Sequence, residues 1–449
     1  MTELNTERAG FATRLGAIAA TAGSAIGLGN IWRFPYEAGQ NGGGAYILVY
    51  IVCVALLGIP VILSEFIIGR STHKNMKGAL RQLSPDSHVY RFTYVCIAGA
   101  IITLGFYAVV CGWVIEYLYQ ALTGRLLGHT PEQYNTMFTD LVGSPWRGVL
   151  WSALFLAVNF WVMRRGVKGG IERVSRVMMP LLLILLVIFC IRSLMLPGSL
   201  AGVRFLLVPD FGQLTWQGAV NAMGQAFMSL TLGISGLVTY SSFFKDDAPL
   251  ARDATTVAIL DTSVAILSGL VIFPAVFSFG MQPEAGPKLI FEVLPAIFQQ
   301  MTAGVIWAIL FFLLVFFASL TSTIALSEIP ITFFQEEYHM SRNAATWWCA
   351  AAVGFISLLS ALSFNVLDKV TLAGMNLFDV FNYAASNVFM LLGGLVTAVY
   401  VGWFLDRTII HDQLTNHGTL TSRIERYTIF CLRYIAPIAV ALIFWSVVC

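Results

Sequence analysis

Residues 23–46 read GSAIGLGNIWRFPYEAGQNGGGAY and form the centre of the first apolar segment of the chain. Gly23, Gly27 and Gly29 lie close together there, and each glycine costs about 1 kcal/mol of helix propensity relative to alanine. The stretch therefore predicts a break in a helix. Unpaired peptide groups are costly in lipid, so such a break is stable only where it lines a protein cavity. The alternative is close helix packing, because Gly23 and Gly27 also form a small-xxx-small pattern.

The composition predicts a protein surrounded by lipid. Of the 449 residues, 57% are hydrophobic and only 11% are charged, whereas a soluble domain carries about 25% charged residues. The formal net charge is +2, and lysine and arginine occur in short loops rather than on one face, which argues against nucleic-acid binding. We expect membrane lipid as a partner, and the sequence leaves the oligomeric state undetermined.

About eleven segments are apolar and long enough to be membrane spans, since a helical span needs about 20 residues. The expected fold is therefore an all-α membrane protein, with spans at 13–38, 44–71, 90–122, 147–164, 170–194, 215–245, 252–280, 303–335, 344–363, 374–404 and 425–448. Basic residues gather in alternate loops, which places the N-terminus in the cytoplasm and the C-terminus outside a plasma (inner) membrane. The apolar, proline-containing loop at 281–302 is expected to form an outer cap of short helices.

The sixth span contains a second interruption, which reads SLTLGISG over residues 229–236. The two interruptions fall in the first span of each of two five-span halves. A matched pair of glycine-interrupted spans is typical of a transporter site at a repeat interface. Half-helix N-termini suit an anion there, while freed carbonyl groups suit a cation. The pair therefore predicts a site for an amino-acid carboxylate together with Na⁺.

Asp261 is a carboxylate within the apolar run VAILDTSVAILSG, residues 257–269. An ionisable residue inside a membrane span is expensive, and its presence indicates a functional site. The alternative is a carboxylate in a solvated inner vestibule.

The glycine-rich stretch at 23–46 resembles the signature of the neurotransmitter:sodium symporter family, in particular its bacterial leucine and hydrophobic amino acid transporters. The likeness extends over nearly the whole chain and includes GQAFMSLTLGISGLVTYSS at 224–242, FFASLTSTIAL at 316–326 and LFDVFNY at 377–383. The association of paired glycine-interrupted spans with transporter sites is known in part from this family. The interrupted spans and the family resemblance are therefore not independent evidence. The resemblance implies two inverted five-helix repeats at 13–194 and 215–404, a cytoplasmic N-terminal segment at 1–12, and an extra helix at 425–448.

Two sodium sites are implied by the resemblance. The first would use the carbonyl of Ala25, the side chains of Asn30 and Ser229, the carboxylate of Asp261 and the substrate carboxylate. The second would use the carbonyls of Gly23, Ile26 and Ala318 with the hydroxyls of Thr321 and Ser322. For the two hydroxyls the alternative is a hydrogen bond to their own helix. Because Asp261 would supply negative charge where many relatives recruit chloride, we expect no chloride.

The implied substrate is a neutral, hydrophobic or aromatic L-amino acid. Relatives that carry monoamines have Asp where this chain has Gly27, so here the substrate should bring its own carboxylate. That carboxylate would meet the amides near Leu28 and Gly29 and the hydroxyl of Tyr107. The substrate-binding residues implied by position are Ala25, Gly27, Leu28, Gly29, Thr103, Tyr107, Met228, Ser229, Thr231, Ile234 and Leu326. These offer no charge, so charged amino acids should be excluded.

Gating residues are also implied by position. Arg33 and Asp379 match an outer charge pair, Arg8 and Glu336 match an inner pair, and Phe11 would plug the inner vestibule. The alternative for each charged residue is a surface or snorkelling side chain. The spacing of Gly170 and Pro180 resembles relatives in which the inner end of span five unwinds, and proline weakens the turn before it.

The sequence therefore predicts a sodium-coupled symporter that works by alternating access. A proton-coupled transporter or sensor on the same scaffold, with Asp261 as the proton carrier, is the alternative. An enzyme is not expected, because the chain contains no HExxH, GxSxG or Walker run. We accordingly expect no catalytic residues.

Overall fold

A computed structural model describes residues 10–280, 288–421 and 424–448. Most of these residues are helical, as the apolar spans predict, and within the described residues a single short hairpin pairs β1 (Thr371–Leu372) with β2 (Met375–Asn376) in an antiparallel ladder. Arg8, one of the predicted gating residues, and most of the predicted 1–12 segment lie outside the described residues.

The helices of the first half begin with the two parts of span one and end at a short helix before span six. They are α1 (Arg14–Ala25), η1 (Gly29–Arg33), α2 (Phe34–Gln40), α3 (Gly44–Cys53), η2 (Val54–Gly58), α4 (Ile59–Thr72), α5 (Met76–Leu83), η3 (Val89–Phe92), α6 (Thr93–Leu122), α7 (Pro131–Gly143), α8 (Pro145–Met163), η4 (Val167–Glu172), α9 (Arg173–Leu194) and α10 (Ser199–Leu207).

The second half has a comparable series of long helices. They are α11 (Trp216–Ser229), α12 (Gly236–Ser241), α13 (Leu250–Ser278), η5 (Leu289–Val293), α14 (Leu294–Gln300), α15 (Gly304–Glu337), α16 (Arg342–Leu362), α17 (Leu377–Tyr383), η6 (Ala384–Phe389), α18 (Met390–Val399), η7 (Tyr400–Phe404), α19 (Arg407–Thr415), α20 (Glu425–Phe430), η8 (Cys431–Ile435) and α21 (Ala436–Val448).

Among the described residues, nine continuous helices are long and apolar enough to cross a membrane, and a tenth span results if the bent pair of α1 and η1–α2 counts as one. Each of these matches a predicted span to within a few residues. The predicted span at 215–245 consists of α11 and α12, which are each too short to cross alone. The count of eleven therefore stays a prediction.

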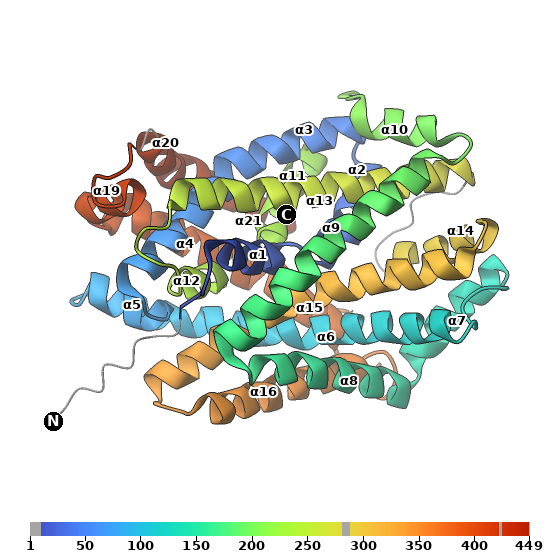
Figure 1. Cartoon of the computed structure of the whole chain (residues 1–449), viewed down its shortest axis with the longest axis horizontal. Coiled ribbons are helices and arrows are strands. Elements are labelled where there is room, and N and C mark those ends of the chain that lie inside the picture. The colour runs from blue at the N-terminus through green and yellow to red at the C-terminus, as the bar shows by residue number, and fades with distance from the viewer. Residues whose placement is uncertain (1–9, 281–287, 422–423, 449) are drawn as a thin grey trace.

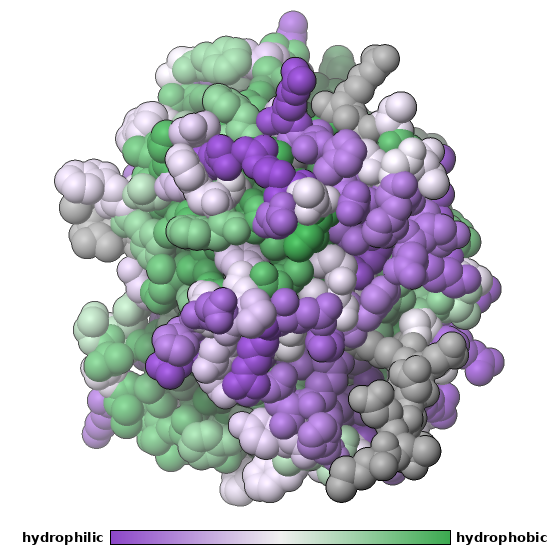
Figure 2. All heavy atoms as spheres, turned by 90° about the vertical axis from the view of Figure 1, so that its left-hand side faces the viewer, coloured by the Kyte–Doolittle hydropathy of each residue, from purple (hydrophilic) through white to green (hydrophobic). Residues whose placement is uncertain are grey.

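The long helices run side by side along the longest axis of the molecule (Figure 1). One end carries α7, α10 and α14, and we call it the α7 end. The opposite end carries α5, α19 and α20, and we call it the α19 end. Hydrophilic side chains cover much of the α19 end (Figure 2). The predicted cap of short helices is confirmed for η5 and α14, while residues 281–287 lie outside the described part of the chain.

Within residues 10–280, 288–421 and 424–448, seven short stretches are π-helical: η1, η2, η4, η5, η6, η7 and η8. A π-turn inserts one extra residue and re-aims the side chains around it, and such turns are frequent at functional sites. Two of them, η1 and η6, lie on either side of the cavity described below.

Candidate functional site

The first predicted helix break is confirmed. Helix α1 ends at Ala25, and Ile26 is extended, with φ −71° and ψ 107°. The helix resumes at Gly29 after a bend of 55°. Two amides of the break are held by side chains: Gly27 N–H donates to Asn30 Oδ1 at 3.1 Å, and Leu28 N–H donates to the Tyr107 hydroxyl at 3.1 Å. The small-residue stretch therefore produces an opened backbone rather than merely a packing face.

The second break lies between α11 and α12, at residues 230–235. Thr231, Gly233 and Ser235 have φ values of +52°, +87° and +61°, a region that L-residues rarely adopt. A Cβ on Gly233 would lie 2.0 Å from the carbonyl oxygen of Met390, and a Cβ on Gly393 would lie 1.6 Å from the carbonyl oxygen of Gly233. Glycine is thus required on both sides where the break packs against α18.

The two breaks contact each other through the carbonyl oxygen of Ser24. Thr231 Oγ1 donates to this oxygen at 3.0 Å and Ser322 Oγ donates at 3.4 Å. Gln225 Nε2 also donates to the carbonyl oxygen of Gly29 at 3.3 Å. Neither Ser24 nor Gln225 was among the predicted site residues. A carbonyl leaves no side-chain signal in a sequence, although Gln225 stands inside the quoted motif at 224–242.

Asp261 lies at the junction of the breaks and is completely buried. Ser229 Oγ donates to Oδ2 at 2.7 Å, Asn30 Nδ2 donates to Oδ1 at 2.7 Å, and the Tyr50 hydroxyl donates to Oδ2 at 3.2 Å. Among the described residues no basic side chain lies within 4.0 Å of this carboxylate. Tyr50 was missed, because an aromatic residue in an apolar span gives no sign of a polar partner.

This environment fits a bound monovalent cation. A buried carboxylate needs a compensating charge, and the hydroxyl and amide bonds to Asp261 are all neutral. The groups gathered around it, from Asn30, Ser229, Tyr50 and the opened backbone, offer several oxygens of the kind that hard cations prefer. Asn30 Oδ1 uses one lone pair for Gly27 N–H and keeps a second.

The residues of the second predicted sodium site are also brought together. A Cβ on Gly23 would lie 3.2 Å from Cβ of Thr321 on α15. Ile26 and Ala318, which follow Gly23 and precede Thr321 by three residues each, are fully buried. Thr321 Oγ1 donates to the carbonyls of Phe317 and Ala318 at 3.0 and 3.1 Å, within its own helix. Ser322 differs, because its hydroxyl crosses to Ser24 on α1.

A cavity of about 560 Å³ adjoins both breaks. Its lining includes all the predicted substrate-binding residues: Ala25, Gly27, Leu28, Gly29, Thr103, Tyr107, Met228, Ser229, Thr231, Ile234 and Leu326. The cavity continues toward the α7 end along aromatic side chains such as Trp113, Phe138 and Phe378. A Cβ on Gly27 would lie 3.2 Å from both Tyr107 Oη and Ser322 Oγ, so a larger residue would crowd these hydroxyls.

Residues of α17, η6 and α18 form a wall of the cavity that was not predicted. They are Asn382, Ala385, Ser386, Asn387 and Met390. Two asparagines and a serine within an apolar span are a sequence signal that could have predicted a polar wall at this position.

The predicted outer pair, Arg33 and Asp379, does not form an ion pair in this structure, although both residues line the cavity. Arg33 Nε lies 3.9 Å from Glu37 Oε1 on its own helix, and Arg33 Nη1 contacts the sulfur of Met228. Asp379 is exposed at the N-terminus of α17. The expected contact is absent because the cavity separates the two elements.

Contacts at the α19 end place the remaining predicted gating residues. Phe11 is buried and packs edge-on against Tyr240 and Phe243, and its role as a plug stays a prediction. Glu336 accepts hydrogen bonds from the backbone and side-chain amides of Asn75, at 2.7 and 2.8 Å. Its predicted partner, Arg8, is outside the described residues.

Glu172 is a further residue that sequence reasoning missed. This buried carboxylate, at the end of η4, accepts from Ala12 N–H at 2.7 Å, Thr13 N–H at 3.1 Å and Thr13 Oγ1 at 2.8 Å. A Cβ on Gly16 would lie 2.2 Å from Glu172 Oε1. Glu172 thus clamps the N-terminus of α1 to the first turn of span five, the turn that contains Gly170.

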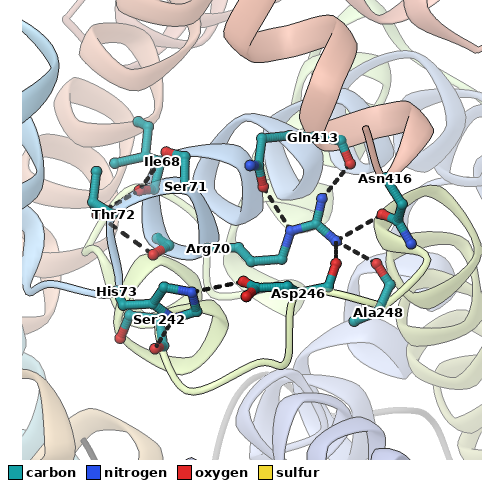
Figure 3. Close-up of polar contacts among 11 residues, drawn as sticks. Ile68, Arg70, Ser71, Thr72, His73, Ser242, Asp246, Ala248, Gln413 and Asn416 are labelled. Carbon is teal, nitrogen blue, oxygen red and sulfur yellow. Dashed lines mark hydrogen bonds and ion pairs between the residues drawn. The ribbon is translucent and has the colours of Figure 1, made fainter. Parts of the chain in front are cut away.

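Arg70 on α4 binds α19 and the segment that follows α12 at the α19 end (Figure 3). Its side chain is buried at the end of α4. Nε donates to Gln413 Oε1 at 2.6 Å and Nη1 donates to Asn416 Oδ1 at 2.9 Å, while further bonds reach the carbonyls of Ala248 and Gln413. Beside it, His73 Nε2 lies 2.9 Å from Asp246 Oδ1. The segment that follows α12 is thereby fixed to α4 and α19.

Two broken spans that frame a cavity and a buried, uncompensated carboxylate define a multi-pass membrane transporter of the broken-helix class. Comparisons with known proteins identify the family. The model of the sodium:neurotransmitter symporter family matches residues 8–140 and 145–449. The chain therefore belongs to the sodium:neurotransmitter symporter family, and it is a transporter rather than an enzyme.

Individual relatives agree with this placement. The chain is 38% identical over 439 residues to an uncharacterized sodium-dependent transporter, YhdH, of Bacillus subtilis, covering 98% of this chain and 97% of the relative. It is 26% identical to the sodium- and chloride-dependent GABA transporter 2 of Rattus norvegicus, covering 91% of this chain and 75% of that protein. The crystal structure of MhsT in complex with L-phenylalanine superposes with a TM-score of 0.90 at 40% identity, covering 98% of this chain and 99% of that chain.

Proposed function

We propose that the protein is a sodium-coupled symporter that imports a neutral, hydrophobic or aromatic L-amino acid. The observation that carries this proposal is Asp261, a buried carboxylate without a basic partner among the described residues, beside the cavity at the junction of the two breaks. A cation that binds there can also contact the carboxylate of a substrate in the cavity. Binding of either ligand then favours binding of the other.

The substrate carboxylate has suitable partners. The hydroxyl of Tyr107 accepts Leu28 N–H and so keeps its own proton for a carboxylate oxygen. The start of η1 at Gly29 adds the partial positive charge of a helix N-terminus. Gly27 brings no acidic group of the kind that would pair with an amine. The cavity walls near Met228 and Ile234 are apolar, and MhsT, the structural relative, was crystallised with L-phenylalanine.

Two sodium ions fit the proposal. The first would be held by the Ala25 carbonyl, Asn30, Ser229 and Asp261 together with the substrate. The second would be held by the carbonyls of Gly23, Ile26 and Ala318 and the oxygens of Thr321 and Ser322, whose donated protons leave lone pairs free. These ions supply positive charge to groups that are otherwise buried without it.

Chloride independence follows from the same carboxylate. The rat GABA transporter is described as chloride-dependent, whereas in this chain Asp261 supplies a fixed negative charge next to the first cation. A chloride ion placed beside Asp261 would be repelled at short range.

Alternating access between the two ends completes the mechanism. The N-terminus and the α19 end face the cytoplasm, and the repeats at 13–194 and 215–404 move relative to each other around the site, with 425–448 outside them. In this structure the cavity extends toward the α7 end, and Phe11, Glu172 and Arg70 close the α19 end. Sodium favours this form, substrate completes the first cation site, and loss of the second ion allows the turn at Gly170 to open.

Uptake by purified protein in liposomes tests the proposal. Labelled L-phenylalanine is supplied with an inward Na⁺ gradient at fixed pH, with choline replacing Na⁺ or gluconate replacing Cl⁻, and the twenty amino acids are used as competitors. We expect uptake that requires Na⁺, survives gluconate and is inhibited by neutral apolar amino acids. Uptake driven by a pH gradient without Na⁺ would instead establish the proton-coupled alternative with Asp261 as carrier.

A further inference from the structure

A wall of the cavity carries neutral polar groups to which the proposed function assigns no role. Asn382, Ser386 and Asn387 line the cavity from α17 and η6. They belong to the span that carries Asp379 but lie one to two helical turns further along it. The cation site at Asp261 and the carboxylate partners near Tyr107 do not involve them.

The hydrogen-bonding capacity of this wall is largely unused. Ser268 and Ser319, in other spans, donate to the carbonyl four residues earlier at 2.8 Å each. Ser386 contacts the side-chain oxygen of Asn382 instead, at 3.4 Å. In the part of the chain that the structure describes, the amide of Asn387 has no hydrogen-bond partner. Ser386 and Asn387 both belong to the π-helical turn η6, and a π-turn changes the side-chain register of the helix that contains it.

The wall lies beside the apolar end of the cavity. A Cβ on Gly99 would lie 2.8 Å from Cβ of Phe389 and 3.6 Å from Cγ2 of Ile234, so η6 meets Ile234 at this point. Thr103, which also lines the cavity, is one helical turn from Gly99 on α6, and its Oγ1 donates to the carbonyl of Gly99 at 2.7 Å. Residues 386 and 387, three residues before 389 and 390, therefore border the region assigned to the substrate side chain.

We propose that Ser386 and Asn387 bind a neutral hydrogen-bonding group at the far end of the substrate side chain and so favour aromatic amino acids with a polar ring, such as tyrosine. This inference rests on the proposed function. A hydroxyl and an amide can both donate and accept, which suits a phenol. An ionised side chain would find no opposite charge on this pair of residues. A purely apolar ring would leave the pair without partners once water is displaced.

Competition between two substrates that differ by one hydroxyl is the test. Purified protein in NaCl binds labelled L-phenylalanine, and unlabelled L-tyrosine and L-phenylalanine compete for the site. The ratio of their inhibition constants is measured for the wild type and for the double variant Ser386→Ala, Asn387→Leu. Thr397→Val is the matched control, because its hydroxyl lies on the same span but bonds to the carbonyl of Gly393 at 2.8 Å.

In the wild type L-tyrosine is expected to compete at least as well as L-phenylalanine. In the double variant L-tyrosine is expected to weaken about tenfold relative to L-phenylalanine, the loss of roughly one well-formed hydrogen bond. Thr397→Val should leave the ratio unchanged. An unaltered ratio in the double variant, or an equal loss for both amino acids, overturns the inference while leaving the proposed function intact. If the wild type shows no Na⁺-dependent binding of any amino acid, the proposed function fails, and this inference fails with it.

Discussion

The charged residues that hold the α19 end together and those that line the cavity, Arg33 and Asp379, differ in whether they have charged or polar partners. At the α19 end Arg70 is buried, and its guanidinium bonds to Gln413, Asn416 and the chain near Ala248. Beside the cavity, Arg33 contacts the sulfur of Met228 and lies 3.9 Å from Glu37 Oε1, and Asp379 is exposed without an ion pair among the described residues. The α19 end is therefore held closed by completed polar contacts, whereas Arg33 and Asp379 line an open cavity and do not pair with each other.

This difference indicates which contacts would form and which would break when the protein changes conformation. Closing the α7 end would pair Arg33 with Asp379 across the cavity, and opening the α19 end would separate contacts such as those of Glu172. Stability of the ligand-free protein should therefore depend strongly on the α19 end and hardly at all on the outer charges. Substitutions at the α19 end and at the cavity test this difference.

Arg70→Ala should have the largest effect. It leaves the buried acceptors of Gln413, Asn416 and the 246–248 segment without donors, and each unpaired buried acceptor costs roughly 1–3 kcal/mol. We expect a loss of about 3 kcal/mol or more in the free energy of unfolding, measured by denaturant titration of purified protein. Arg252→Ala, which removes an exposed arginine near the same end, should change stability by no more than about 0.5 kcal/mol. Equal effects of the two substitutions would show that the Arg70 contacts do not hold this end together.

Glu172→Gln should have an intermediate effect. Hydrogen bonds to a charged acceptor are worth about 1.5–3 kcal/mol, and the amide keeps only part of the contact with Ala12 and Thr13. We therefore expect a loss of about 1–2 kcal/mol of stability by the same titration. Asp140→Asn, at an exposed position of α7, is the control.

The substitution should also open the α19 end more often. A cysteine introduced at Ala17, which is buried near the clamp, should react faster with a water-soluble thiol reagent in Glu172→Gln than in the otherwise native protein. Unchanged reactivity would mean that Glu172 does not restrain the end of span one.

Arg33→Ala and Asp379→Ala should have the smallest effect on stability. Because the two side chains do not meet, each substitution should change the unfolding free energy by no more than about 0.5 kcal/mol, and a double-mutant cycle should give a coupling near zero. Uptake should nevertheless fall about tenfold or more, since closure of the α7 end requires the pair. A ligand-free coupling energy above about 1 kcal/mol would contradict the open outer end.

Much of the fold and of the site could be predicted from the sequence. The apolar runs predicted the spans because lipid imposes a minimum length, and the glycines at 23–29 and Gly233 predicted the breaks because helix propensity is local. Asp261 was identified because a carboxylate in an apolar run is costly. The substrate-binding residues implied by the family resemblance all line one cavity.

What the sequence could not provide depends on long-range contacts. The carbonyl of Ser24 has no side-chain signal. Glu172, at the start of the predicted span 170–194, gives no sign of the backbone at the N-terminus of α1 that it binds. The place of Ser386 and Asn387 in the cavity wall depends on how η6 packs against the other spans, which local propensity does not specify. The state of the gate at Arg33 and Asp379 is a property of the conformation, which residue types alone do not specify.

The most direct test of the central claim, that the opened backbone and Asp261 together hold Na⁺ and an amino acid, is equilibrium binding of labelled L-phenylalanine to purified protein. The wild type and Asp261→Asn are compared in sodium gluconate, sodium chloride and choline chloride. We predict equal wild-type binding in the two sodium salts, none in choline chloride, and a loss of at least about 100-fold in Asp261→Asn in sodium gluconate, because a buried charge that compensates the cation is removed. Wild-type binding that persists in choline chloride, or unchanged binding by Asp261→Asn in sodium gluconate, would contradict the account.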